Sequence, residues 1–90
     1  MSSNAFLKDP NAALDYVFDW SAWLNGDTIA TASVTVDSGI TKDLQTNTTT
    51  NVTVWLSGGA AGQTYNVTCR ITTAAGRIDD RTIQIMVQDR

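Results

Sequence analysis

The stretch TYNVTCRITT, at residues 64–73, and the stretch RTIQIMVQD, at residues 81–89, decide the fold class of this chain. In both of them apolar and polar side chains alternate with a period of two, which is typical of a β-strand with one buried face. The intervening segment AAGRIDD supplies Gly76 and the pair Asp79 and Asp80, residue types that favour turns. The sequence therefore predicts a β-hairpin whose apolar side chains face one common core.

The rest of the chain repeats this pattern in shorter pieces. Residues 14–20, 28–36 and 52–56 are predicted strands, because apolar side chains alternate there and turn-forming Gly, Asn or Asp stand between them. The polar residues 41–51 favour a loop or an edge strand, and helical spacing is limited to a single turn at residues 20–24. The predicted fold is all-β: an immunoglobulin-like antiparallel β-sandwich of about seven strands, with no internal disulfide.

The chain divides into two segments of different character. Residues 1–13 are polar and contain Pro10, and we expect them to form an extended N-terminal arm. Residues 14–90 are expected to form one immunoglobulin-like domain, because a chain of 90 residues suits a single small core. The predicted core residues are Trp20, Val34, Val54, Tyr65, Val67, Cys69, Ile71, Ile83, Ile85 and Val87.

Cys69 limits the chemistry that this core can perform. It is the only Cys and the chain has no His, so neither a Cys-His nucleophile nor a zinc site is expected. We interpret Cys69 as a small core hydrophobe. Tyr65 resembles the tyrosine of the immunoglobulin corner, although it stands four residues before the cysteine rather than two.

The charged residues are few and scattered. The net charge is −3, from nine acidic residues, all of them Asp, and six basic ones. Without a basic cluster, binding to nucleic acid or to an anionic membrane is not expected. No apolar run is long enough to span a membrane, and the N-terminal sequence does not resemble a signal peptide. We therefore expect synthesis in a cytoplasm, which agrees with a single unpaired Cys.

Catalysis, cofactor binding and metal binding are not expected from these residue types. An all-oxygen calcium site or a pair of catalytic carboxylates is formally open to a chain with nine Asp. The Asp residues lack the spacing of a calcium loop, however, and we interpret Asp27, Asp79 and Asp80 as solvated turn residues. No catalytic residue, no cofactor and no metal ligand is predicted, and the chain is not expected to be an enzyme.

Three apolar side chains are candidate contacts with a partner. Phe6 and Leu7 are adjacent in a polar terminus, and would either pack on the domain's own core or dock on a neighbouring subunit. Trp55 is on the outward face of its strand, because the alternating apolar residues of that strand point inward. It would therefore either cover the outer face of the sheet or contact a partner. As an alternative, Trp20, Trp23 and Trp55 would stack on sugar rings.

The chain as a whole resembles one family. The resemblance lies in a series of short sequence segments that occur in a fixed order over nearly all of the 90 residues. They are KDP, LDY with DWSAWL, GDTIA, GIT, TNVTVWLSGG and GQTYNVTCRITTAAGRIDDRTI. They are similar to the small immunoglobulin-like virion proteins of tailed bacteriophages that are often described as fiber-tail adaptor proteins. The matching stretches are residues 8–10, 19–24, 26–29 and 65–80, and most of them also have a plain role in the fold.

The resemblance implies a non-enzymatic structural protein of the virion, which joins or decorates parts of the head, neck or tail. Its partners would be other virion proteins (portal, tail, fibre or capsid) or further copies of itself, reached through the N-terminal arm and one sheet edge. It would be synthesised in the cytoplasm of the host bacterium. The alternative hypothesis is a carbohydrate-binding module that recognises host surface glycan through exposed Trp.

Overall fold

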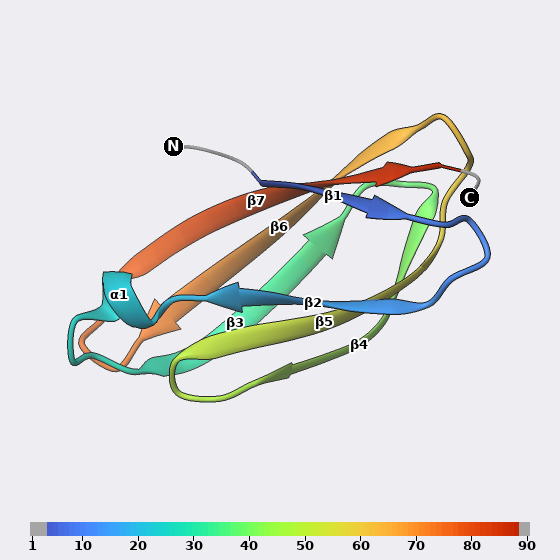
Figure 1. The fold of residues 1–90 in the computed structure, drawn as a ribbon. Coiled ribbons are helices and arrows are strands. Elements are labelled where there is room, and N and C mark those ends of the chain that lie inside the picture. Colours follow the sequence, from blue (N-terminus) through green and yellow to red (C-terminus); the bar gives the residue numbers. More distant parts are fainter. Residues whose placement is uncertain (1–3, 89–90) are drawn as a thin grey trace.

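Residues 4–88, which the computed structural model describes, form seven β-strands and one helical turn (Figure 1). In chain order these are β1 (Asn4–Lys8), β2 (Leu14–Asp19), α1 (Ser21–Leu24), β3 (Ile29–Val36), β4 (Ile40–Asn47), β5 (Asn51–Gly58), β6 (Thr64–Thr73) and β7 (Ile78–Val87). None of the helical structure within these residues is long and apolar enough to cross a membrane.

The strands form two sheets with a common core between them. One sheet has the order β1-β7-β6-β3 and the other has the order β2-β5-β4 (Figure 1). The chain therefore changes sheet four times, after β1, after β2, after β3 and after β5. The pairs are antiparallel, except that β1 runs parallel to β7. The immunoglobulin-like sandwich is confirmed, and the parallel first strand is its one departure from a fully antiparallel fold.

The first strand lies within the segment for which we expected an extended arm. It is extended, but it pairs with β7 along its whole length and forms an edge of the four-stranded sheet. Lys8 at its end is fully buried, and its ammonium donates hydrogen bonds to the carbonyl oxygens of Gly58 (2.7 Å) and Asp9 (3.0 Å). Burial lowers the pKa of Lys8 against the opposing effect of nearby carboxylates. The predicted segments also include residues 1–3 and 89–90, which lie outside the described residues.

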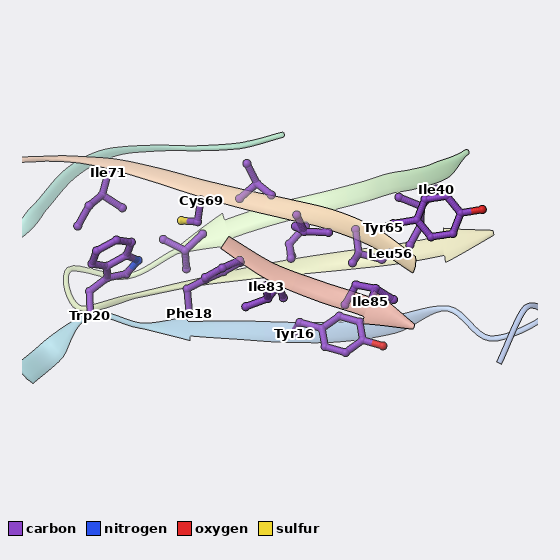
Figure 2. Packing of buried hydrophobic residues seen from close by; sticks show 14 of the residues in the cluster. Tyr16, Phe18, Trp20, Ile40, Leu56, Tyr65, Cys69, Ile71, Ile83 and Ile85 are labelled. Carbon is purple, nitrogen blue, oxygen red and sulfur yellow. The ribbon is translucent and has the colours of Figure 1, made fainter. Parts of the chain in front are cut away.

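The core fills the space between the sheets (Figure 2). Side chains of β2 and β5 meet those of β6 and β7 there, with Trp20 near one end and Tyr65 near the other. Every residue that the sequence predicted for the core is buried in the structure. The buried apolar set also includes Tyr16, Phe18, Leu24, Ile29, Ile40, Val52 and Leu56.

The β6–β7 hairpin has a shorter turn than the sequence predicted. The two strands pair in continuous antiparallel register, and only residues 74–77 connect them. The prediction that Asp79 and Asp80 belong to the turn is wrong, because both residues lie in β7. Asp80 is held there by an ion pair with Arg70 on the neighbouring strand (Nε to Oδ1, 2.7 Å), a cross-strand contact that offsets the preference of Asp for turns.

Tyr65 joins three segments at one end of the core. Its hydroxyl accepts a hydrogen bond from the Ala60 N–H (2.9 Å) in the glycine-rich crossover. Its ring fits against Gly39 and Gly59: a Cβ added to Gly39 would lie 2.9 Å from Cε1, and one added to Gly59 would lie 3.3 Å from Cε2. A bond from the tyrosine hydroxyl to the upstream backbone characterises the immunoglobulin corner. It is present here despite the different spacing from the cysteine.

Cys69 and Trp20 interact inside the sandwich. Both are fully buried. Burial raises the pKa of the Cys69 thiol to about 11, while the indole N–H of Trp20 acts in the opposite direction. The indole nitrogen of Trp20 is buried and makes no hydrogen bond to any of the described residues. Cys69 therefore packs against a tryptophan without forming a disulfide.

Replacing Gly39 by Ala is expected to lower the free energy of unfolding by about 3 kcal/mol. Gly39 has a φ of 108°, and the added Cβ would collide with Tyr65. Gly26→Ala is the matched control: its φ is 93°, but no atom lies within 4 Å of the added Cβ. Backbone strain alone should then cost about 1 kcal/mol. Urea denaturation followed by Trp fluorescence measures both variants, and equal losses would contradict a role for the contact with Tyr65.

Replacing Cys69 by Ala is expected to lower the free energy of unfolding by about 1 kcal/mol at pH 7. The thiol pKa is raised from 9.0 to about 11 in the folded chain. The stability that the neutral thiol contributes is therefore complete below pH 9 and is lost as the pH rises toward 11. The difference between wild type and Cys69→Ala should narrow over that window in urea denaturation at a series of pH values. A difference that stayed constant would mean that the thiol does not titrate as a buried group.

Candidate interaction surface

The two apolar residues of the first strand have different environments. Phe6 packs against the core, with its ring centroid 5.3 Å from that of Tyr16 and an interplanar angle of 58°. Leu7 faces solvent and is 47% exposed. The sequence left open whether these two residues pack on the core of their own domain or contact a partner, and the structure gives a different answer for each residue. Phe6 docks on its own domain, and Leu7 is free to meet a partner.

Trp55 lies on the outer face of the β2-β5-β4 sheet, where its neighbours across the strands are Asp15 and Leu44. Its side chain is half-buried rather than fully exposed. Val17 and Leu44 lie on the same face and are 54% and 53% exposed. Val17, Leu44 and Trp55 therefore form an apolar stripe across three strands, termed here the outer apolar stripe.

Two residues of this stripe were not predicted from the sequence. Val17 stands between Tyr16 and Phe18, and the alternation that buries these two rings turns Val17 outward. That signal was available in the sequence. Leu44 is a single apolar residue in a polar stretch, and only its pairing opposite Trp55 places it beside the stripe.

Carboxylates border the outer apolar stripe. Asp15 and Asp19 flank Val17 on β2, and Asp43 lies beside the stripe at a register shift in β4. All three Asp residues are exposed to solvent. The backbone N–H and the hydroxyl of Ser21 hold the pKa of Asp19 below its usual value, which keeps this group charged. The face thus combines an apolar centre with a negatively charged border.

The outer face of the four-stranded sheet is polar. It contains a depression of about 310 Å³ lined by Ser33, Thr35, Thr68, Arg70 and Asp80. The two charges in this depression are paired with each other, with Arg70 nitrogens 2.7 and 3.1 Å from the Asp80 oxygens. This pairing lowers the pKa of Asp80. Among residues 4–88, no three His, Cys, Asp or Glu side chains are grouped closely enough to hold a metal ion.

Two contacts between cations and aromatic rings close the end of the sandwich that contains α1. The Arg81 guanidinium lies 4.2 Å from the centre of the Trp20 ring, and that of Arg77 lies 4.3 Å from the centre of the Trp23 ring. Arg77 also pairs with Asp27 (3.2 Å), whose side chain is only 12% exposed. Asp27 does lie in the turn between α1 and β3, but the interpretation of its side chain as solvated is wrong. Trp20 is buried and Trp23 is covered by Arg77, so neither offers a free ring face to a sugar.

The comparison with known proteins agrees with this fold. A family model described as "Podophage GP4 fiber-tail adaptor protein gp77" matches residues 8–86 of the 90-residue chain. No curated protein matches the chain. The matched range runs from the buried Lys8 at the end of β1 to Met86 in β7, and so includes nearly the whole sandwich. The resemblance found in the sequence is confirmed, and the chain belongs to the family of podophage fiber-tail adaptor proteins.

Proposed function

We propose that this chain is a non-enzymatic structural component of a tailed bacteriophage virion and that it joins a fibre to the tail. The observation that carries this proposal is the match of residues 8–86 to a family described by that role. The chain is synthesised in the host bacterial cytoplasm and enters the virion on assembly. Its one thiol is fully buried, which suits both the reducing cell and the oxidising medium outside it.

The chemistry of the two outer faces supports a role as a joint. One face presents the outer apolar stripe with its carboxylates, and the other presents hydroxyl groups around the paired Arg70 and Asp80. An adaptor has to hold two different proteins at once. Two unlike faces on opposite sides of one small sandwich allow it to do so without competition between the partners. We assign the tail and the fibre as these partners.

Sugar binding has no comparable support. The matching family is described as an adaptor, and of the three Trp residues Trp20 is buried, Trp23 is covered by Arg77, and Trp55 is half-buried in a strand. Stacking on a pyranose requires an open ring face.

Deletion of the gene from its phage tests the proposed function, with the chain supplied from a plasmid as the control. Particles made without the chain are expected to keep their tails and to lack fibres, because the joint between the two is missing. Electron microscopy and mass spectrometry of purified virions measure fibre content. Supply of the wild-type chain should restore it. The proposal would be refuted if particles made without the chain had a normal fibre content, or if wild-type virions did not contain the chain.

A further inference from the structure

The edge strands of the two sheets differ in how far they are protected from further pairing. Along β3, the Gln45 amide accepts a hydrogen bond from the Val34 N–H (3.1 Å) and donates one to the Ala32 carbonyl (3.0 Å). The Lys42 ammonium donates to the Val34 carbonyl (3.0 Å). Register shifts interrupt both β3 and β4. Bulges and side chains that cover backbone groups are common means of blocking an edge, so the edge of β3 is covered by side chains and the edge of β4 is interrupted by a bulge.

β2, on the opposite side, has an uninterrupted register with β5. The Trp20 N–H donates to the Thr50 carbonyl (3.0 Å), which continues this register by one more pair. In an antiparallel pair only every second residue bonds across to the partner strand. The even-numbered residues of β2 therefore bond to β5. The N–H and C=O groups of Asp15 and Val17 point to the open side.

The open stretch of β2 is short and has definite ends. The strand begins at Leu14. At the other end the Asp19 carbonyl accepts a hydrogen bond from Arg81 (2.7 Å). Between these ends lie the four backbone groups of Asp15 and Val17, which have no side-chain partner among residues 4–88. This is enough backbone for a short added strand.

The side chains along this edge indicate what kind of strand fits. Asp15, Val17 and Asp19 are exposed on the outer face and stand at alternate positions. A strand that pairs with β2 would place its own side chains directly opposite them, where opposite charges and apolar pairs are favourable. The complementary pattern is a basic residue, an aliphatic residue and a second basic residue at alternate positions.

A second copy of the chain does not have this pattern. Antiparallel pairing of two copies of β2 centred on Val17 would place Asp15 of each copy opposite Asp19 of the other. Like charges directly across two strands are destabilising. The edge therefore favours a different protein over self-association.

We propose that β2 accepts an extended segment of a virion partner, the tail or the fibre, with basic residues on either side of an aliphatic one. The added strand bonds to the backbone of Asp15 and Val17 and places its basic side chains against Asp15 and Asp19. Its apolar side chain extends the outer apolar stripe beyond Val17. This inference rests on the proposed function, and it names the surface through which one of the two attachments is made.

The test uses the phage that lacks the gene, complemented with variants of the full chain. Val17→Pro removes the outward N–H without removing a bond to β5, since proline is tolerated at such edge positions. Val17→Ile at the same site keeps both the N–H and an aliphatic side chain and is the matched control. We expect Val17→Ile to restore fibres close to the wild-type level. Val17→Pro is expected to restore them at least about tenfold less well, a loss of about 1.4 kcal/mol in binding.

Asp15→Lys is the second variant, because it changes an exposed side chain and does not depend on the fold accepting a proline. It is expected to reduce fibre restoration about tenfold by replacing a favourable cross-strand pair with a repulsive one. Asp43→Lys carries the same charge change on the opposite edge strand of the same face, and a clearly smaller effect is expected from it because Asp43 does not lie along β2. Hydrogen exchange of the β2 amides, compared between the free chain and the assembled virion, should show protection on assembly.

The outcomes separate the two proposals. If the wild-type chain itself does not restore fibres, the proposed function fails. If the wild type succeeds and both Val17→Pro and Asp15→Lys restore fibres equally well, strand addition at β2 is refuted while the function stands. An effect of Asp43→Lys as large as that of Asp15→Lys would also refute it, because the whole face rather than the β2 edge would then bind.

Discussion

The burial of one face of β6 is the constraint on which the rest of the structure depends. This strand lies inside the four-stranded sheet, and its inward residues Tyr65, Val67, Cys69 and Ile71 are all buried. Each fully buried apolar side chain of this size contributes about 1.5–3 kcal/mol, and no disulfide connects the two sheets. Because the side-chain period of a strand is two, a shift of one residue would expose the whole set. This burial therefore fixes which residues of β6 point outward, and with them the outward residues of its neighbours β3 and β7.

Trp20 and Cys69 extend the same constraint to the end of the sandwich. In antibody domains a buried tryptophan packs against a disulfide between the sheets. Here the tryptophan comes from the segment that joins β2 to α1, and the single thiol of β6 takes the place of the disulfide. The guanidinium of Arg81, on β7, then covers the tryptophan ring. Besides its own backbone bonds from Leu24 to Trp20 and from Asn25 to Ser21, the turn α1 is therefore held by contacts with the hairpin.

The parts of the fold that were predicted from the sequence are those in which apolar and polar side chains alternate along a strand. The β6–β7 hairpin, the rings of β2 and the buried Cys69 all stand in regular apolar patterns. The parallel pairing of β1 with β7 was not predicted, because it joins the two ends of the chain and buries Lys8 within a polar segment. The assignment of Asp80 failed for a similar reason, since its partner Arg70 is ten residues away in sequence and is adjacent only in the sheet.

The candidate interaction surface likewise contains some residues that the sequence predicted and others that only the structure identifies. Trp55 was placed on the outer face from its strand pattern, whereas Leu44 became part of the stripe only through pairing with β5. The difference between closed and open edges depends on where the side chains of Gln45 and Lys42 reach. Side-chain reach of that kind follows from tertiary structure and leaves no periodic pattern in the sequence.

The parallel pairing of β1 with β7 also determines how the domain responds to mechanical force. Because the two strands run side by side in the same direction, the start of β1 and the end of β7 lie at opposite ends of the pair (Figure 1). Tension applied between these two points acts along the strands and loads their hydrogen bonds together, in shear, instead of opening them one at a time. A domain without any covalent cross-link between its sheets can thus resist extension between the start of β1 and the end of β7.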